Sequence, residues 1–338
     1  MKILLAICLA LAVAWAGYWF IGSAALKSGI TAWFGARQAE GWDVDYTDLS
    51  VKGFPSRFDT TFTDLQLSDP ASGLGWQMPF FQLMTLSYTP NHVIAVWPNE
   101  QRITAPEGTY TLTSRNMRAS LVVEASTALA PRRAMLTAED LAWAPYTGGD
   151  AVTIAALRLA IERAPDATGT SNPSYHLGLA ADNVAPAANL LALIDTQGVQ
   201  PRVIDMLNAD ITVDFSAPWD HFAIESARPQ PTRVEVTRLA ATWGAMTLEA
   251  SGNLDVDARG IPSGVITVNA RNWENMLALA AGAGVLTSDA ATMAKRALGM
   301  IAGGAGNAKT LEIPLRFEAG RVWLGPLPIA DAPVLQLR

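Results

Sequence analysis

The pattern of apolar and polar side chains divides the chain into a short apolar beginning and a long strand-rich body. Residues 3–22 carry no charged side chain and follow Lys2. A helix of about 20 such residues is about 30 Å long, which is the hydrocarbon thickness of a bilayer. Trp15, Tyr18 and Trp19 near its far end suit the level of the lipid headgroups. Residues 1–22 are therefore predicted to be a single-pass transmembrane helix that anchors the chain.

A cleaved signal peptide is the alternative interpretation of this segment. Ala14-Trp15-Ala16 has the small-x-small pattern of a signal cleavage site. However, residues 18–21 continue the apolar run past that site, so a cleaved chain would begin with exposed apolar side chains. Cys8 follows Ile7 rather than a small residue, which argues against lipid attachment at this cysteine.

A second helical pattern follows in residues 23–41. Leu26, Ile30, Trp33 and Phe34 recur at helical spacing, and Gly41 stands where a helix-ending glycine is expected. The pattern predicts an amphipathic connecting helix that either extends the anchor or lies along the membrane surface. Its apolar stripe would pack on the chain's own domain, or alternatively on the membrane interface.

From residue 42 the apolar positions alternate with a period of two, which is typical of half-buried strands. Gly53-Phe54-Pro55 is a predicted turn, so residues 51–67 form two strands joined by a kink or a bent hairpin. The short turns and the lack of intervening helices predict an antiparallel meander. The further expected strands are 42–47, 82–88, 92–97, 101–105, 109–115, 117–126, 134–143, 152–163, 174–183, 209–215, 221–226, 233–243, 245–256, 264–270, 310–317 and 321–324.

A few helices interrupt the strands. Residues 185–208 predict two short helices separated around Gly198 and Pro201, and Asn272 is expected to cap a helix that runs to about residue 281. Another helix is expected at 288–301. No linker divides residues 42–338, so the predicted fold is α+β: an N-terminal transmembrane helix, then one elongated, twisted, mainly antiparallel β-sheet domain with a few packed helices.

Composition narrows the classes of function. The net charge of −7 argues against nucleic acid as a partner, because phosphate binding requires clustered Lys and Arg. Cys8 is the only cysteine, so the body has no disulfide, thiolate metal site or cysteine nucleophile. A hydrophobic content of 50% with 16% charged residues is high for a soluble chain, and it indicates an extensive interior or an apolar surface that faces lipid or a partner.

The sequence contains no motif that predicts catalysis or metal binding. His92, His176 and His221 are far apart in predicted strands, and no His-Glu-x-x-His occurs. Residues 260–264 lack the spacing of a nucleophile elbow and are expected to be a hairpin turn. We therefore expect no catalytic, cofactor-binding or metal-binding residues and no cofactor, and we expect a protein that is not an enzyme.

Two acidic patterns are better explained as structure. Residues 255–260 resemble the opening of a calcium loop, but Arg259 and Ile266 occupy positions that should supply oxygen ligands, so a turn is expected. Asp43 and Asp45 share one strand face and could serve acid–base chemistry, but no matched partner is visible. A solvated sheet face explains them.

One motif resembles a known family. The turn Gly53-Phe54-Pro55-Ser56-Arg57-Phe58-Asp59 is similar to an early turn of DUF2125, a family of uncharacterised bacterial proteins, and residues 311–317, 320–322 and 325–328 also fit that family. The resemblance implies an envelope protein of unassigned activity, and no catalytic residue carries over. By its own chemistry the turn should place Phe54 under the sheet and allow an ion pair between Arg57 and Asp59.

These observations lead to a non-enzymatic inner-membrane protein with its C-terminal body in the periplasm. Its sheet is expected to present an apolar concave face, which is either filled by the helices near 190–207 and 272–301 or open to acyl chains. The expected partners are the membrane, and a lipid or an envelope protein. One alternative is an envelope scaffold or protein-interaction module. Another is a hydrolase of envelope polymers, which would need two buried carboxylates about 5–9 Å apart.

Overall fold

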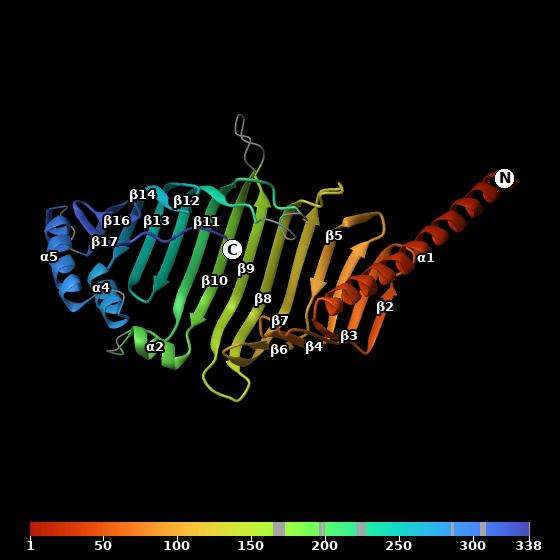
Figure 1. Ribbon diagram of the computed structural model, residues 1–338, viewed down its shortest axis with the longest axis horizontal. Coiled ribbons are helices and arrows are strands. Elements are labelled where there is room, and N and C mark those ends of the chain that lie inside the picture. The colour runs from red at the N-terminus through yellow and green to blue at the C-terminus, as the bar shows by residue number, and fades with distance from the viewer. Residues whose placement is uncertain are drawn as a thin grey trace. The chain divides into compact units, whose positions relative to one another are not determined.

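The computed structural model describes residues 1–164, 173–195, 198, 200–220, 223, 228–284, 287–304 and 309–337. It consists of an N-terminal apolar helix followed by antiparallel strands with a few helices between them, which confirms the predicted α+β class (Figure 1). The chain divides into two compact units. The first comprises Met1–Val123 and Leu136–Gly149, and the second Glu124–Met135 and Asp150–Arg338.

Helix α1 (Lys2–Ala39) runs without a break through both predicted N-terminal segments. Its sequence contains no proline, and its apolar side chains favour a helix in either a membrane or a packed interior. The helix ends where the glycine pattern predicts, because Gly41 adopts a φ of +94° that a residue with a Cβ rarely takes. The predicted amphipathic helix at 23–41 is thus the second half of one longer helix.

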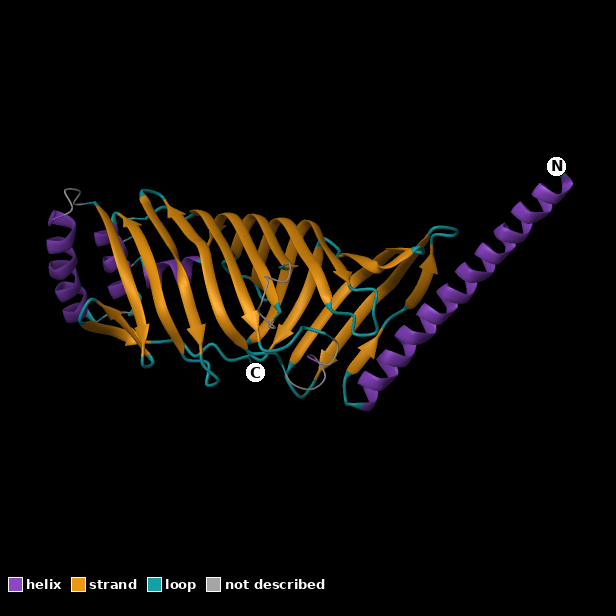
Figure 2. Ribbon diagram, turned by 90° about the horizontal axis from the view of Figure 1, so that it is seen from above, coloured by secondary structure: helices purple, strands orange, loops and turns teal. Residues whose placement is uncertain are grey.

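The first unit is built around two long central strands (Figures 1 and 2). Strand β3 pairs on one side with β1 and β2, which lie end to end, and on the other side with β4. Strand β4 pairs in turn with β5 and β6, which also lie end to end and both pair with β7. These strands are β1 (Asp43–Asp45), β2 (Asp48–Lys52), β3 (Arg57–Asp69), β4 (Leu74–Leu86), β5 (Thr89–Val96), β6 (Glu100–Ala105) and β7 (Gly108–Val123).

The buried face of β3 changes from even to odd positions partway along the strand. Phe58 and Phe62 are buried before Asp64, whereas Leu65 is buried after it. Asp64 has a φ of +50°, and the β3–β4 ladder skips it together with the opposite residue Pro79, which has no N–H to donate. This local break lets two out-of-phase apolar patterns face the same side of the sheet.

That side of the sheet packs against the second half of α1. Phe34 of the helix is buried against Phe62, and their ring centroids lie 5.8 Å apart. Ile30 packs on the same cluster, so the apolar stripe of residues 23–41 packs on the protein's own sheet. The buried members of the cluster are Phe34, Val44, Leu49, Phe62, Leu65 and Met78.

In the second unit, the strands from β9 to β17 form a meander in which each strand is antiparallel to the next. Strand β8 (Pro131–Pro145) contributes residues to both units. The meander comprises β9 (Val152–Arg163), β10 (Ser174–Ala185), β11 (Ile204–Phe215), β12 (Pro231–Trp243), β13 (Met246–Val256), β14 (Pro262–Arg271), β15 (Thr310–Glu318), β16 (Arg321–Leu324) and β17 (Leu327–Asp331). The closing hairpin turns at Ala319 and Gly320, both with positive φ, as the sequence predicts.

Helices are inserted between the strands of this unit: α2 (Ala188–Ile194), α4 (Trp273–Gly282) and α5 (Ser288–Gly304). Trp273 of α4 and Leu298 of α5 are buried against Ala270 and Leu311 on β14 and β15. The expected helices near 272–301 thus cover part of the sheet with apolar side chains.

Several sequence predictions need correction. The second short helix expected before residue 208 is wrong, because residues 204–208 begin β11 and pair with both β10 and β12. The strands expected at 109–115 and 117–126 are a single strand, β7, which passes through Asn116 at a φ of +55°. The strand expected at 82–88 begins earlier, at Leu74. The strand expected at 221–226 lies outside the described residues, apart from Ala223.

Asn272 also behaves differently from the expectation. It stands at the N-cap position of α4, but its side chain makes no cap hydrogen bond. Its Nδ2 instead donates to the backbone oxygen of Ala245, and its φ of +56° turns the chain out of β14. The residue therefore links the helix start to the β12–β13 turn.

Candidate functional site

An apolar groove lies between the second half of α1 and strands β3 and β4 of the first unit. Its volume is about 500 Å³, within the usual range for pockets that bind small molecules. The helix contributes Ala25, Leu26, Gly29, Ile30, Trp33 and Phe34, and the strands contribute Phe62, Leu65, Leu67, Phe81 and Leu83. None of these side chains is charged, so the groove suits an apolar ligand.

The groove exists because two small residues face the sheet at helical spacing. Ala25 and Gly29 lie one turn apart on α1, and the space around Gly29 is open, since a Cβ built there meets no atom within 4 Å. Trp33, one turn further on, is 50% exposed, whereas Phe34 is buried. Small side chains at 25 and 29 thus leave a gap that larger apolar residues border.

Arg37 lies next to the Trp33 end of this groove. The guanidinium carbon of Arg37 lies 5.7 Å from the centroid of the Trp33 ring, and Arg37 Nη1 is 2.8 Å from a carboxylate oxygen of Glu40. Exposed ion pairs of this kind contribute about 0–1 kcal/mol. The groove lining itself offers no nucleophile, acid or base, so the arrangement can bind but has no evident chemistry.

The Gly53–Asp59 turn attaches the first half of α1 to the sheet. Trp15 Nε1 donates to the backbone oxygen of Pro55 at 2.9 Å, and Trp19 Nε1 donates to that of Arg57 at 2.7 Å. The Phe54–Pro55 peptide is cis. The predicted ion pair is present, with 3.0 Å between Arg57 Nη2 and Asp59 Oδ2.

Phe54 does not lie under the sheet, contrary to the sequence expectation. Its side chain is 52% exposed and stacks on Phe20 of α1, with 5.6 Å between ring centroids. Trp19 contacts it edge-on at 5.5 Å. The reason is that α1 passes this turn and offers aromatic rings, whereas the sheet side is already filled by Phe58, which is buried against Trp19.

Each of the two histidines that the structure describes, His92 and His176, lies next to a hydroxyl group on a neighbouring strand. His92 Nε2 is 2.9 Å from Ser120 Oγ, and His176 Nδ1 is 2.8 Å from Thr212 Oγ1, each on a neighbouring strand. His221 lies outside the described residues. Within the part of the chain that the structure describes, no group of three metal-ligating side chains occurs.

The carboxylates considered for acid–base chemistry, Asp43 and Asp45, do not form a buried pair. Asp43 and Asp45 are both exposed on β1. Among the residues with a described position, Asp195 is the one buried carboxylate, and its Oδ2 accepts the backbone N–H of Gln200 at 2.6 Å. This bond joins the end of α2 to Gln200, and the described residues provide no pair of buried carboxylates in a cleft.

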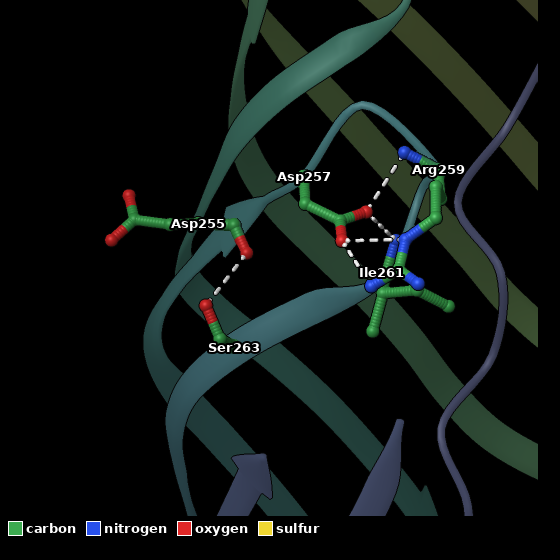
Figure 3. A network of polar contacts seen from close by, with 5 residues as sticks. All are labelled: Asp255, Asp257, Arg259, Ile261 and Ser263. Atoms are coloured by element: carbon green, nitrogen blue, oxygen red, sulfur yellow. Dashed lines mark hydrogen bonds and ion pairs between the residues drawn. The ribbon is translucent and has the colours of Figure 1, made fainter. Parts of the chain in front are cut away.

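The calcium-like segment forms a tight turn (Figure 3). Asp257 Oδ1 accepts the backbone N–H groups of Arg259 and Ile261, both at 2.9 Å, and Oδ2 contacts the Arg259 guanidinium at 3.0 Å. The Ile261 N–H, followed by the Arg259 side chain, lowers the pKa of Asp257. The carboxylate oxygens are thus used within the turn, as the sequence predicts.

Calcium is accordingly expected to leave this hairpin unchanged. We expect millimolar CaCl2 to produce no shift of the thermal unfolding midpoint, because Arg259 fills the place of a ligand. Asp257→Ala should lower that midpoint by removing the acceptor of two N–H groups, whereas Asp255→Ala, whose side chain is exposed, should change it little. A midpoint raised by calcium and insensitive to Asp257→Ala would contradict this interpretation.

Sequence reasoning missed the groove itself. The sequence predicts the helical stripe of residues 26–34, but the gap depends on the small residues at 25 and 29 and on side chains of β3 and β4. The spacing of Ala25 and Gly29 beside a Trp-Phe pair is the local signal that could have indicated it. The strand residues carry no comparable signal, since alternating apolar positions occur throughout the chain.

Comparison with known proteins places the chain in one family and finds no further relative. A family model described as "Uncharacterized protein conserved in bacteria (DUF2125)" matches residues 19–333. No curated protein matches the sequence. No solved structure matches it either.

Proposed function

The chain belongs to this uncharacterised bacterial family, DUF2125, and we propose that it is a non-enzymatic, membrane-anchored protein that binds the acyl chain of a lipid. Helix α1 would hold it in the inner membrane, with the strand-rich body in the periplasm. The observation that carries the proposal is that the apolar groove is formed by the same helix that is long and apolar enough to cross a membrane. A cleaved signal peptide, the alternative for residues 1–22, would meet the same length and composition criteria.

The position of the groove along α1 supports a lipid ligand. Gly22 ends the uncharged run and Ala25 is the first groove residue, so about 5 Å of helix separates them. If α1 crosses the bilayer, the groove opens immediately beside its surface. An acyl chain could then enter by following the helix, without passing through water.

The energetics favour reversible exchange with the membrane. An acyl chain in a bilayer is already in an apolar medium, so its transfer to an apolar groove has little hydrophobic driving force. Its release into water, in contrast, costs about 0.8 kcal/mol per CH2 group. A groove of this kind would load and unload beside a membrane but would retain its lipid in solution.

Charge and cysteine content support a periplasmic body. Lys2 precedes the apolar run, as expected of a cytoplasmic end, although Lys27 and Arg37 follow it and weaken the bias. The body beyond Cys8 is free of cysteine, so an oxidising compartment would leave it unaltered.

The direct test of the proposed function is the identification of bound lipid. Full-length protein should be extracted in a mild detergent and analysed by native mass spectrometry, followed by lipid extraction. We expect a fraction of molecules to carry a mass that corresponds to one phospholipid or fatty acid. Protein that is folded, carries no lipid and takes none up from added vesicles would overturn the lipid proposal. A stoichiometric protein partner in place of lipid would favour the envelope scaffold.

Anchoring is tested separately by fractionation. Full-length protein is expected to remain with membranes after alkaline carbonate washing, and a C-terminal β-lactamase fusion should confer resistance only if the body is periplasmic. A variant without residues 2–14 should be released from the membrane, because it lacks most of the uncharged run. It should still fold, because it keeps Trp15, the first residue of α1 that contacts the sheet. Full-length protein in the soluble cytosolic fraction would contradict anchoring by α1.

A further inference from the structure

Exposed aromatic and apolar side chains gather where α1 first meets the sheet of the first unit. Phe20 is 60% exposed, Ile21 73%, Phe54 52% and Tyr88 62%. Tyr88 belongs to this group because it follows Ser87, whose backbone oxygen accepts the hydroxyl of Tyr18 at 2.6 Å. We call the set formed by Trp15, Tyr18, Phe20, Ile21, Phe54 and Tyr88 the aromatic collar.

The length of helix free of the sheet is too short to cross a bilayer by itself. Residues 3–14 separate the charged Lys2 from Trp15, which is the first residue to bond to the sheet. Twelve helical residues rise about 18 Å, whereas the hydrocarbon core is about 30 Å thick. The missing length is supplied by residues 15–22, so the part of the sheet bonded to them must lie at the same depth.

We propose that the aromatic collar is immersed in the bilayer that α1 crosses, from the last part of the hydrocarbon core to the headgroups, so that this end of the sheet enters the membrane. The inference rests on the proposed anchoring by α1. Aromatic side chains are favoured at the headgroup level, where one part of the ring is apolar and another can reach water. Lipid therefore covers the exposed side chains of the collar. The groove begins at Ala25, about one helical turn after Ile21.

Backbone hydrogen bonding at the collar fits a water-poor environment. A polar backbone group that enters lipid must be bonded internally. The Pro55 oxygen accepts Trp15 Nε1, the Arg57 oxygen accepts Trp19 Nε1, and the Ser87 oxygen accepts the Tyr18 hydroxyl. The Gly53 and Ser56 oxygens accept the backbone N–H groups of Arg57 and Ser87, both at 2.9 Å. These carbonyl groups of the turn are thus bonded internally, and its one exposed charged side chain, Arg57, is paired with Asp59.

The charges around the collar also suit a lipid surface. Lys27 lies less than two turns beyond Ile21 on α1, and Lys52 lies two residues before Phe54; both are exposed. Long basic side chains keep their stems on apolar surface and their ammonium groups at phosphates. Helix α1 carries no Asp or Glu, so no carboxylate of the helix would be forced toward the anionic headgroups.

The depth of the collar can be measured with a single labelled cysteine. In full-length Cys8→Ala protein reconstituted in phosphatidylcholine–phosphatidylglycerol vesicles, Phe54→Cys carries an environment-sensitive NBD label. Leu74→Cys is the matched control, because Leu74 is 54% exposed but lies at the opposite end of the β3–β4 hairpin, where it pairs with Asp69. The Phe54→Cys label should show blue-shifted emission and loss of emission with nitroxide-labelled lipids. The control label should show neither.

The outcomes separate this inference from the proposed anchoring. Flotation of the vesicles first establishes whether the protein is bound. Vesicle-bound protein whose Phe54→Cys label emits as in water and is quenched by iodide would overturn the inference alone. A label shielded from iodide but unaffected by nitroxide lipids would also overturn it, because a second copy or another protein would then cover the collar. Tyr88→Cys repeats the measurement if Phe54→Cys does not fold.

Discussion

Gly29→Leu is expected to weaken lipid binding strongly while leaving the fold intact. The added side chain would enter the groove, because a Cβ at this position meets no atom within 4 Å. Forcing a ligand past an added side chain costs about 1–3 kcal/mol, which corresponds to about a fivefold to 150-fold loss of affinity. Leucine also favours a helix over glycine by about 1 kcal/mol, so stability should not fall. The lipid carried per protein, measured by mass spectrometry after extraction, reports the result.

Gly35→Leu is the matched control for this experiment. Gly35 lies on the same helix, its Cβ position is equally open, and it is exposed outside the groove lining. The change in helix propensity is therefore the same, and only the position of the side chain differs. Gly35→Leu should retain lipid at the level of the unaltered protein. If Gly29→Leu retained as much, the groove between α1 and the sheet would not be the binding site.

The regular parts of the fold follow from local patterns in the sequence. The strand predicted at residues 152–163 is present as β9 with the same bounds. The hairpin at Ala319 and Gly320 and the turn at Asp257 are also predictable, because a positive φ and an Asx-type acceptor each require particular residues. These features depend on near neighbours in the chain.

The errors occur where distant residues decide the structure. Residues 204–208 have an apolar spacing that also fits a helix, but pairing with β10 and β12 makes them a strand. Phe54 is drawn to Phe20, which lies 34 residues earlier, rather than to its own sheet. No local pattern indicates either partner. The sequence therefore predicted a helix for residues 204–208 and packing of Phe54 under its own sheet.

The point at which α1 begins to contact the sheet could not be predicted from the apolar pattern either. The uncharged run ends at Gly22, but contact with the sheet begins at Trp15. Gly22 lies so close to the Phe58 ring that a Cβ would come within 2.9 Å of it. The residues predicted to be purely a membrane segment therefore also form a packing surface, because the same apolar side chains satisfy both environments.

Phe62→Ala is expected to cause the largest loss of stability in the first unit. Phe62 is 3% exposed, and its ring lies 5.8 Å from that of Phe34 and 6.0 Å from that of Phe81. Removal of a buried phenyl ring typically costs about 3–5 kcal/mol. Urea unfolding of the detergent-solubilised protein, followed by tryptophan fluorescence, should show this loss. Leu74→Ala, which truncates an exposed side chain, should change the free energy of unfolding by less than about 0.5 kcal/mol.

The presence of lipid should reduce the effect of Phe62→Ala. Because Phe62 lines the groove, the space left by its ring is continuous with the groove rather than a closed cavity. A bound acyl chain can fill part of this space and restore some of the lost contacts, whereas the delipidated variant must leave it to solvent. The difference in unfolding free energy between Phe62→Ala and unaltered protein should therefore be smaller in lipid-loaded than in delipidated samples. An equal difference in both would mean that the ligand does not reach Phe62.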